Sequence, residues 1–346
     1  MLTGGNNVVR RADVARLAGT SPAVVSYVLN GGPRPVAPAT RERVLAAVEQ
    51  LGYRPNGIAR SLRMNRTMTL GLVVPDTANP FFAELARAVE ECAFAHEYRL
   101  LIGNSAEDDG RQTSYVHTVL ARQVDGLFLV PTHGPLTCGP ELMRSTTPWV
   151  VLDRHPAGVS GALEVRVDNL AGARDATRHL LEHGHTRVGC IAGPADVRSA
   201  VERVEGWRLA MTETGVLPER RLLRQAPFGR RAAYEAARDL LTTTDVTALF
   251  VASDEQAFGV LRAAAQSGVG CPEDLAIVSF DGTAGAAYTT PALSTMAQPF
   301  AEIATIAMEL VRRRVNGDRA VVGPAILPMK MRPGGSCGCP DPPGAD

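Results

Sequence analysis

Four aspartates stand where apolar runs of the sequence end. Asp76, Asp153 and Asp281 each follow such a run directly, and Asp254 stands just after another. Carboxylates can bridge neighbouring hydroxyls while an aromatic face covers the apolar side of a ring, so the pattern suits a small polyhydroxylated ligand. Further candidates for such a site are Asn79, Phe81, Phe82, Phe228 and Ser253. For Asp76, Asp153 and Asp254 the alternative is that each only caps a helix, a position that favours aspartate.

These side chains can form one site only if the strands before them have their carboxyl ends at the same edge of a sheet. Apolar runs typical of buried parallel strands occur at 70–75, 100–102, 126–130, 149–152, 188–192, 248–251 and 276–280. Helical stretches separate them, such as 81–97, 171–183, 203–214, 232–241 and 256–266. Alternating strands and helices predict an α/β body with doubly wound parallel sheets. Ligands of such sheets bind outside the carboxyl ends of the strands, where the aspartates stand.

The N-terminal segment has a different pattern. Residues 13–18 carry apolar side chains at helical spacing, Gly19 interrupts them, and Ser21-Pro22 restarts a helix with a capping hydroxyl and a proline. Two short helices joined at a glycine indicate a helix-turn-helix in a small all-α head. On the second helix, one side is predicted to pack through Val25, Val28 and Leu29. The other side is predicted to face outward with Pro22, Ala23, Ser26, Tyr27 and Asn30.

The outward face and the charge of this segment both suit DNA. Pro22 and Ala23 can contact thymine methyl groups, and the Tyr27 hydroxyl can reach a base edge or a phosphate. No arginine or glutamine stands where a bidentate base contact is normally made, so this helix is expected to read sequence only modestly. The first 66 residues hold ten arginines against three carboxylates, a charge of +7. The remaining 280 residues hold 26 basic and 33 acidic side chains, a charge of −7, so the head alone attracts a polyanion.

The chain resembles the lactose/galactose repressor (LacI/GalR) family of bacterial transcription regulators. In the head, the resemblance lies in Asp13-Val14-Ala15, Ala18-Gly19, Val25 to Asn30, Thr40-Arg41, Leu51 to Asn56 and Ala59 to Leu62. In the body, it lies in Asn79-Pro80-Phe81-Phe82, Val124 to Leu127, Leu152-Asp153-Arg154, Val167-Asp168-Asn169, Gly184 to Arg187 and Pro272 to Val278. It covers nearly the whole chain.

For the head, the resemblance implies how DNA is gripped. It assigns base-facing positions to Pro22, Ala23 and Tyr27, and phosphate contacts to Ser21, Ser26, Asn30 and Thr40. Further DNA contacts are expected from Arg11, Asn56, Ala59 and Arg60. Leu62 is the expected wedge, because paired hinge segments in the minor groove open the central base step with one leucine each. The alternative for Leu62 is a linker residue that touches the next domain. Paired hinges imply a homodimer on a near-palindromic operator.

For the body, the resemblance implies a type I periplasmic-binding-protein-like fold with two subdomains. The chain would cross between them near Val167-Asp168, near Leu293 and near Gly323. Asp281 matches the family's ligand-binding aspartate. Val201 stands where many members carry a ligand-gripping arginine, and Arg203 is interpreted as structural. A missing guanidinium fork favours an uncharged effector, or none.

Four segments are predicted: the DNA-binding head at 1–53, a hinge helix and linker at 54–66, an effector-binding and dimerisation domain at 67–333, and a disordered tail at 334–346. The tail prediction rests on a composition of proline, glycine and cysteine from Met331 onward. No apolar run approaches the roughly 18 residues that span a bilayer, and residues 1–9 lack a signal-peptide core. We therefore expect a cytoplasmic protein, nucleoid-associated when bound to DNA, with no membrane partner.

No metal, cofactor or catalytic residue is expected. The six cysteines lack the paired spacings of a zinc site. His179, His183 and His185 are close in sequence, but no acidic ligand accompanies them. No nucleophile motif is present.

The sequence thus predicts a sequence-specific DNA-binding repressor, homodimeric and controlled by a sugar-like effector between the two subdomains. One alternative is a solute-binding protein with a non-specific DNA anchor, whose affinity would depend on salt but hardly on sequence. The other is an α/β enzyme acting on a sugar, with the cleft carboxylates as acid and base, although the chain lacks a phosphate-cradling loop.

Overall fold

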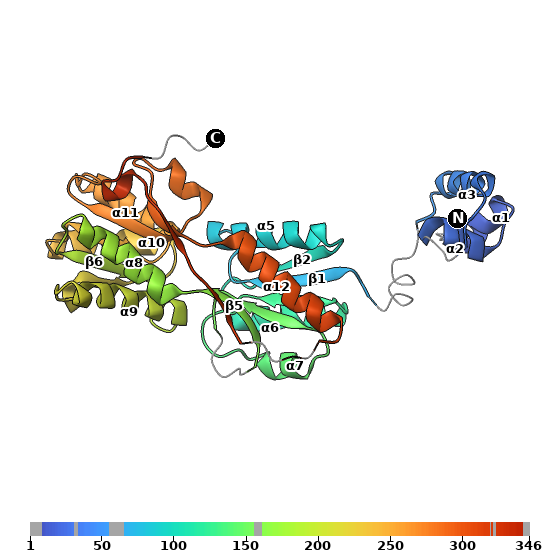
Figure 1. The fold of residues 1–346 in the computed structure, drawn as a ribbon, viewed down its shortest axis with the longest axis horizontal. Coiled ribbons are helices and arrows are strands. Elements are labelled where there is room, and N and C mark those ends of the chain that lie inside the picture. The colour runs from blue at the N-terminus through green and yellow to red at the C-terminus, as the bar shows by residue number, and fades with distance from the viewer. Residues whose placement is uncertain are drawn as a thin grey trace, which may run out of the picture. The chain divides into compact units, whose positions relative to one another are not determined.

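The structure, a computed structural model, describes residues 9–30, 34–54, 66–155, 161–318, 320 and 323–341 of the 346-residue chain. The chain divides into two compact units, a head that ends at Thr67 and a body that begins at Met68. Figure 1 draws both units and labels many of their helices and strands.

The described part of the head contains three helices, α1 (Arg11–Leu17), α2 (Pro22–Asn30) and α3 (Pro38–Leu51). At the start of α1 the backbone nitrogen of Arg10 donates to Asp13 Oδ2 at 2.8 Å. The turn after α1 passes through Gly19 with a φ of +62°, a conformation that costs glycine little. Ser21 Oγ accepts a hydrogen bond from the Val24 nitrogen at 3.3 Å and opens α2. The helices enclose a core of Val14, Ala15, Ala18, Val25, Val28, Val44 and Ala47, which confirms the predicted helical head.

The body has two lobes, each built on its own six-stranded sheet. The first lobe has the strand order β11-β5-β4-β3-β1-β2, with every pair parallel. Its strands are β1 (Thr69–Val74), β2 (Arg99–Asn104), β3 (Gly126–Leu129), β4 (Trp149–Leu152), β5 (Leu163–Val167) and β11 (Ala325–Leu327). Side chains alternate between the two faces of the sheet. Leu70 and Leu72 pack under α5 (Pro80–Ala95) and α12 (Phe300–Val315), whereas Val73 packs under α6 (Asp109–Ala121) and α7 (Gly139–Arg144).

The second lobe has the strand order β12-β10-β9-β8-β6-β7, in which only β10 and β12 run antiparallel. Its strands are β6 (Val188–Ala192), β7 (Leu223–Gln225), β8 (Ala248–Val251), β9 (Ala276–Asp281), β10 (Ser294–Ala297) and β12 (Lys330–Arg332). Its α-helices are α8 (Asn169–Glu182), α9 (Arg198–Glu213), α10 (Arg230–Thr243) and α11 (Asp254–Gln266). Helices α8 and α9 meet at Gly206, where a Cβ atom would lie 2.3 Å from the Leu170 carbonyl oxygen. The two-lobed α/β body is therefore as predicted.

Among the described residues the chain crosses between the lobes three times. The first crossing follows β5 at Val167, as predicted. The second follows Ala297 rather than Leu293, because Ser294–Ala297 adds another strand to the second sheet. The third follows Leu327 rather than Gly323, because β11 first pairs with β5.

The C-terminal segment packs against the second lobe as far as Asp341, so the tail predicted to be disordered from residue 334 is wrong over its described part. Gly335–Cys337 forms a 3₁₀ turn, and Ser336 is fully buried. Ser336 Oγ donates to the Ile277 carbonyl oxygen at 2.7 Å. Composition misled the prediction because these side-chain and turn hydrogen bonds fix a glycine-rich segment that has no helical or strand periodicity.

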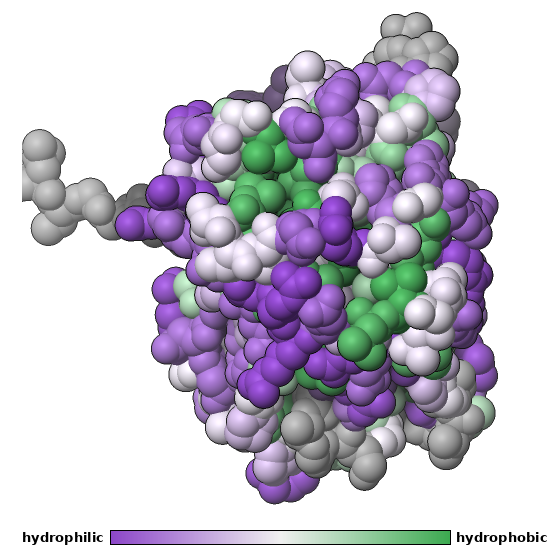
Figure 2. Space-filling view, turned by 90° about the vertical axis from the view of Figure 1, so that its left-hand side faces the viewer, coloured by the Kyte–Doolittle hydropathy of each residue, from purple (hydrophilic) through white to green (hydrophobic). Residues whose placement is uncertain are grey.

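Figure 2 shows the end of the body formed by the second lobe, where hydrophilic side chains cover most of the surface and apolar ones occupy small separate areas. Scattered apolar exposure of this kind is normal for a folded protein. No helix in the described ranges is both long enough and apolar enough to cross a membrane.

Candidate functional site

The head exposes several of the residues predicted to contact DNA. Exposed positions are Arg11, Ser21, Pro22 and Ala23, and half-buried positions are Tyr27 and Thr40. The positions outside the described residues are Asn56, Ala59, Arg60 and Leu62, together with the side chain of Asn30. The start of α2 therefore offers an accessible surface, and the individual DNA contacts remain predictions.

Ser26 differs from its neighbours because it is only 6% exposed. Helix α2 packs against both α1 and α3. Its buried arc is therefore wider than the predicted stripe of Val25, Val28 and Leu29, and it includes Ser26. The prediction that Ser26 faces outward is wrong in this structure.

A cavity of about 150 Å³ lies between the two lobes of the body. A cavity of this size accommodates one six-membered ring. Eight of the ten predicted effector residues line it: Asp76, Asn79, Phe81, Phe82, Asp153, Phe228, Ser253 and Asp281. The other lining residues are Glu107, His133, Arg154, Ser199, Arg203 and Pro227, of which Arg203 had been predicted to be structural.

In the wall of the first lobe, Asn79 fixes the position of two aromatic rings. Its Oδ1 accepts a hydrogen bond from the Phe81 nitrogen at 3.0 Å, and Pro80 occupies the first position of α5. The rings of Phe81 and Phe82 pack edge to face with their centroids 5.0 Å apart. They provide an apolar area beside the carboxylates.

The same wall contains a paired charge. Arg154 donates from Nη1 and Nη2 to the two carboxylate oxygens of Glu107, each at 3.0 Å, and its guanidinium lies 5.4 Å from the Phe82 ring centroid. Burial would raise the pKa of Glu107, but His133 and Arg154 lower it to about 2. This bidentate pair occupies the guanidinium fork, which leaves it less able to bind an anionic ligand.

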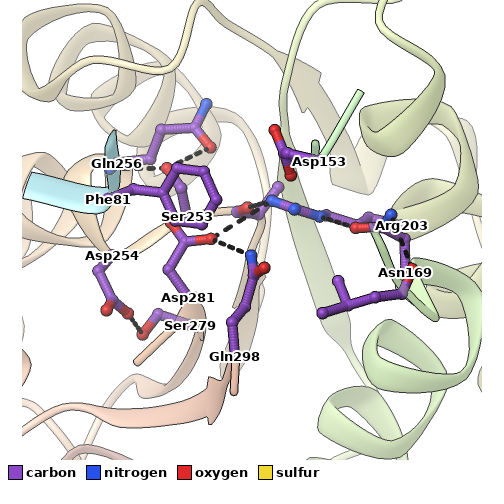
Figure 3. Close-up of polar contacts among 12 residues, drawn as sticks. Phe81, Asp153, Asn169, Arg203, Ser253, Asp254, Gln256, Ser279, Asp281 and Gln298 are labelled. Carbon is purple, nitrogen blue, oxygen red and sulfur yellow. Dashed lines mark hydrogen bonds and ion pairs between the residues drawn. The ribbon is translucent and has the colours of Figure 1, made fainter. Parts of the chain in front are cut away.

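Arg203 of α9 supplies the cation of the second lobe's wall (Figure 3). Its side chain is 4% exposed, its Nε donates to Asn169 Oδ1 at 2.9 Å, and its Nη1 donates to the Ala252 carbonyl oxygen at 2.6 Å. The guanidinium lies 3.8 Å from the Phe280 ring centroid and 3.8 Å from Asp281 Oδ1. Burial lowers the pKa of Arg203, and neighbouring carboxylates oppose that shift.

Two positions on α9 are placed differently from what was expected for the effector site. Val201 is 38% exposed and does not line the cavity, whereas Arg203 does. Residues two apart in an α-helix are separated by about 200° around its axis, so they face different surroundings. Ser199 lies four residues before Arg203 and lines the cavity with it. An arginine therefore lines the cavity although none stands at position 201, and the hydrogen bonds of Arg203 also fit the structural role predicted for it.

Asp153 and Asp281 reach the cavity from opposite lobes. Their φ angles are +62° and +114°, a region that costs a residue other than glycine about 1–3 kcal/mol. Asp281 Oδ1 accepts a hydrogen bond from Gln298 Nε2 at 3.0 Å. Asp153 Oδ1 is buried, and none of the described residues donates to it. Burial raises the pKa of both carboxyls, against the effect of the nearby arginines.

Asp254 lies behind the cavity wall and does not line it. It is fully buried and accepts hydrogen bonds from Ser279 Oγ at 2.5 Å and Thr295 Oγ1 at 2.8 Å. Two more come from Thr283, through its backbone nitrogen at 2.6 Å and its Oγ1 at 2.9 Å. Four donors saturate this carboxylate, which joins α11 to β9, β10 and the loop between them.

Neither Asp254 nor Asp76 is the capping residue of the helix that follows it. Helix α11 is capped by Ser253, whose Oγ accepts from the Gln256 nitrogen at 3.1 Å. Asp76 Oδ1 accepts from the Ala78 nitrogen at 2.9 Å in the turn before α5, although Asn79 is the cap of that helix. Asp76 thus combines a local structural contact with a place on the cavity.

Two polar contacts join the lobes directly. The Ala284 nitrogen in the second lobe donates to Glu84 Oε1 on α5 at 2.7 Å. His133 Nδ1 in the first lobe lies 3.7 Å from Asp196 Oδ2 in the second. A ligand inside the cavity would contact side chains of both lobes.

The charges on the cavity wall limit what it can bind. Carboxylates outnumber guanidiniums, with Asp76, Glu107, Asp153 and Asp281 against Arg154 and Arg203. Both guanidiniums already lie beside a carboxylate. The wall therefore favours a neutral ligand with several hydroxyl donors and an apolar ring face over an anion.

Comparisons with known proteins match both units. The family model "Bacterial regulatory proteins, lacI family" matches residues 12–56, and "Periplasmic binding protein-like domain" matches residues 177–337. The ribose operon repressor of Escherichia coli K12 is 36% identical over 309 residues, which cover 88% of this chain and 92% of that protein.

Two solved structures show the same fold over 95% of this chain and 99% of theirs. The complex of the transcriptional regulator CelR with cellobiose has a TM-score of 0.71 at 31% identity. The lac repressor dimer bound to operator and the anti-inducer ONPF has a TM-score of 0.83 at 26% identity. With the same family indicated by its head, its body and its relatives, this chain belongs to the lacI family of bacterial regulatory proteins.

Proposed function

We propose that the chain is a sequence-specific transcriptional repressor that binds a near-palindromic operator as a homodimer and is controlled by a single-ring, sugar-like effector between its lobes. The observation that carries this proposal is a cavity whose carboxylates come from both lobes, in a chain with a basic helix-turn-helix head. A relative named for a ribose operon and a solved structure bound to operator support it. Such a regulator would act in the cytoplasm, on the nucleoid.

The head supports binding to DNA through charge and exposure. Its net charge of +7 over the first 66 residues contrasts with −7 over the rest of the chain. Pro22 and Ala23 are exposed at the start of α2, where a recognition helix contacts base edges. Because neither side chain makes a bidentate base contact, much of the sequence preference would come from the shape and deformability of the operator.

Apolar side chains on the first lobe support a second copy of the chain as partner. Phe94, at the end of α5, is 59% exposed, and Leu101 and Ile102 on β2 are 40% and 50% exposed. Strand β2 is an edge strand, and an uncovered apolar edge promotes unwanted pairing between chains. A two-fold interface over this surface would cover it in both copies.

The cavity supports a ligand of one ring. Its volume of about 150 Å³ accommodates one ring rather than two. Asp153 Oδ1 is a buried acceptor that no described residue satisfies, and such an atom costs about 1–3 kcal/mol. A ligand hydroxyl that donates to Asp153 would recover part of this cost, and Asp281 would accept a second hydroxyl from the other lobe.

Ligand binding would be coupled to DNA binding through the arrangement of the lobes. A ligand held by both walls favours their closed arrangement. In a dimer this arrangement sets the separation of the two hinge segments, and so whether they can pair in the minor groove. Coupling of this kind is typically about 1–3 kcal/mol, or about 5- to 150-fold in operator affinity.

Operator binding is tested by selecting random duplexes with the full-length chain at near-physiological salt and sequencing the retained pool. We expect an inverted repeat with a fixed central step. A pool that stays random while binding weakens steeply with salt would contradict a repressor. It would instead support the solute-binding protein with a non-specific DNA anchor.

The effector is tested on the selected operator with a panel of aldopentoses and aldohexoses, and with cellobiose as a two-ring control. We expect a single-ring sugar to change operator affinity, and cellobiose to leave it unchanged. A response only to cellobiose would contradict the single-ring class. No response to any sugar would contradict a sugar-like effector, although the operator result would stand.

A further inference from the structure

The C-terminal segment brings two thiols onto two imidazoles of α8. His179 lies in the last turn of α8, and His183 is the residue that caps its end. Cys337 and Cys339 come from the segment that packs beside them. One ligand atom from each residue, the ring nitrogens and the two sulfurs, lies within 4.8 Å of all the others. In sequence the thiols stand far from the histidines, which is why spacing alone predicted no metal.

Three of the nitrogen-to-sulfur distances in the cluster are close to those around a tetrahedral ion. His179 Nε2 lies 3.2 Å from Cys337 Sγ and 3.6 Å from Cys339 Sγ, and His183 Nε2 lies 3.6 Å from Cys339 Sγ. Around a tetrahedral Zn²⁺, with bonds of about 2.3 Å to sulfur and about 2.0–2.1 Å to nitrogen, sulfur and nitrogen ligands lie about 3.6 Å apart. The side chains would need little movement to close around an ion.

The backbone of the tail holds the thiols in this arrangement. Gly338, between the two cysteines, has a φ of +89°, which an L side chain rarely adopts. Cys337 is 1% exposed, and the neighbouring Ser336 Oγ accepts a hydrogen bond from the Ser294 nitrogen at 2.9 Å. The Gly335 nitrogen donates to Asp341 Oδ1 at 2.5 Å and closes the turn. Protein contacts therefore fix one half of the cluster, and α8 fixes the other.

The ligand types select the ion. Two thiolates and two imidazoles are soft to borderline donors that suit Zn²⁺, whereas Mg²⁺ and Ca²⁺ require oxygen ligands. Four protein ligands leave no open position, as in structural rather than catalytic zinc sites.

We propose that His179, His183, Cys337 and Cys339 bind one Zn²⁺ ion in a closed tetrahedral site that fastens the C-terminal segment to α8. The ion joins two segments that each enter the second lobe from a crossing. Helix α8 begins directly after β5, and the tail follows β12, the strand after the third crossing. The site is thus a clamp on the second lobe, separate from the cavity and independent of the proposed repressor function.

The test uses the full-length chain, purified with a phosphine reductant and without chelator. We expect one equivalent of zinc per chain by mass spectrometry of the metal. We also expect replacement by Co²⁺ to give the visible absorption of a tetrahedral site with thiolate-to-cobalt charge transfer. A reduced chain that neither retains nor takes up Zn²⁺, and shows no such Co²⁺ spectrum, overturns the proposal.

Matched variants locate the ion. His183→Ala and Cys339→Ser change exposed or half-buried residues and should each abolish zinc retention. The controls His185→Ala and Cys92→Ser should retain it, because neither residue belongs to the cluster. A chelator should lower the thermal midpoint of the wild-type chain but leave that of Cys339→Ser unchanged. Zinc retained by both cluster variants, or lost equally from the controls, overturns the assignment.

Discussion

The cavity wall and the layer directly behind it both contain buried aspartates near the carboxyl ends of strands, but they supply those aspartates with hydrogen bonds very differently. Asp254, in the layer behind, accepts four hydrogen bonds. Asp153, on the wall, has an oxygen that receives none from the described residues, and Asp281 receives one from Gln298 and faces Arg203. The position after a strand is shared, so it does not separate a structural carboxylate from a ligand-binding one. The two kinds of carboxylate are separated by the number of hydrogen-bond donors that the protein already supplies to them.

The backbone separates the same residues. Asp254 is the first residue of α11 and does not have a positive φ angle, whereas Asp153 and Asp281 do. Strain of this kind is kept where the surrounding structure imposes it, and it is common at functional sites. Backbone strain at Asp153 and Asp281 therefore lowers the stability of the wall, whereas the hydrogen bonds to Asp254 stabilise the layer behind it.

The largest expected effect is on folding, in the layer behind the wall. Asp254→Ala should lower the free energy of unfolding by about 3–5 kcal/mol, because it leaves buried donors of Ser279, Thr283 and Thr295 without their acceptor. Chemical denaturation measures this loss, with Asp254→Asn as a control that keeps the shape and should lose less. A loss below about 1 kcal/mol would mean that the hydrogen-bond network contributes little.

The next effect is on ligand binding, at the wall. Asp153→Asn should weaken binding of the effector found with the operator about 10- to 100-fold, by removing a charged acceptor. It should leave the stability of the ligand-free chain unchanged or raised, since it removes a buried charge and asparagine tolerates a φ of +62°. Calorimetric titration and denaturation of the same variant check both parts. A stability loss as large as that of Asp254→Ala would erase the distinction between the two regions.

A smaller effect is expected from pH. Burial raises the pKa of Asp153 and of Asp281 above the usual value near 4, so lowering the pH from neutral should weaken effector binding through protonation before ordinary exposed aspartates titrate. The sign for folding is opposite. A carboxyl with a raised pKa in the folded state contributes stability at low pH that is lost as the pH rises through that pKa. Binding and unfolding measured across this range should therefore change in opposite directions, and both slopes should shrink in Asp153→Asn.

The smallest effect is expected at a residue that lies off the wall. Val201→Arg should change effector affinity by no more than about 0.5 kcal/mol, because this position does not line the cavity. Arg203→Lys, in contrast, loses the planar fork that contacts Asn169 and Ala252 and should weaken binding clearly. An increase in affinity on introducing arginine at 201 would restore the role first predicted for that position.

Much of the fold followed from the sequence because its central strands are continuous apolar runs. All seven predicted runs form strands, β1, β2, β3, β4, β6, β8 and β9. The strands that escaped prediction are short or interrupted by charge. Residues 163–167 alternate apolar side chains with Glu164 and Arg166, β10 begins with the polar Ser294 and Thr295, and β7, β11 and β12 have three residues each. Such segments become strands through their neighbours in the sheet, and their own pattern is too weak to reveal it.

Site residues that directly follow a strand could be predicted from the sequence. Arg203, whose long side chain extends into the site from helix α9, could not be predicted in this way. Asp76, Asp153 and Asp281 were found by position alone. The place of Arg203 on the cavity wall was missed, although its spacing of four from Ser199 put both residues on one helical face. Asp254 looked equivalent to the other aspartates, since nothing in a sequence shows that three hydroxyls and an amide converge on one carboxylate.

The pairing of β11 with β5 and of β12 with β10 affects how the protein is made. The first lobe's other strands are complete at Val167, yet the edge of β5 lacks its neighbour until residues 325–327 have been synthesised. Both sheets therefore receive their final strands only after residues 325–332 have been synthesised. A nascent chain stopped shortly before this point would present two open sheet edges at once, which makes it prone to aggregation and to recognition by chaperones.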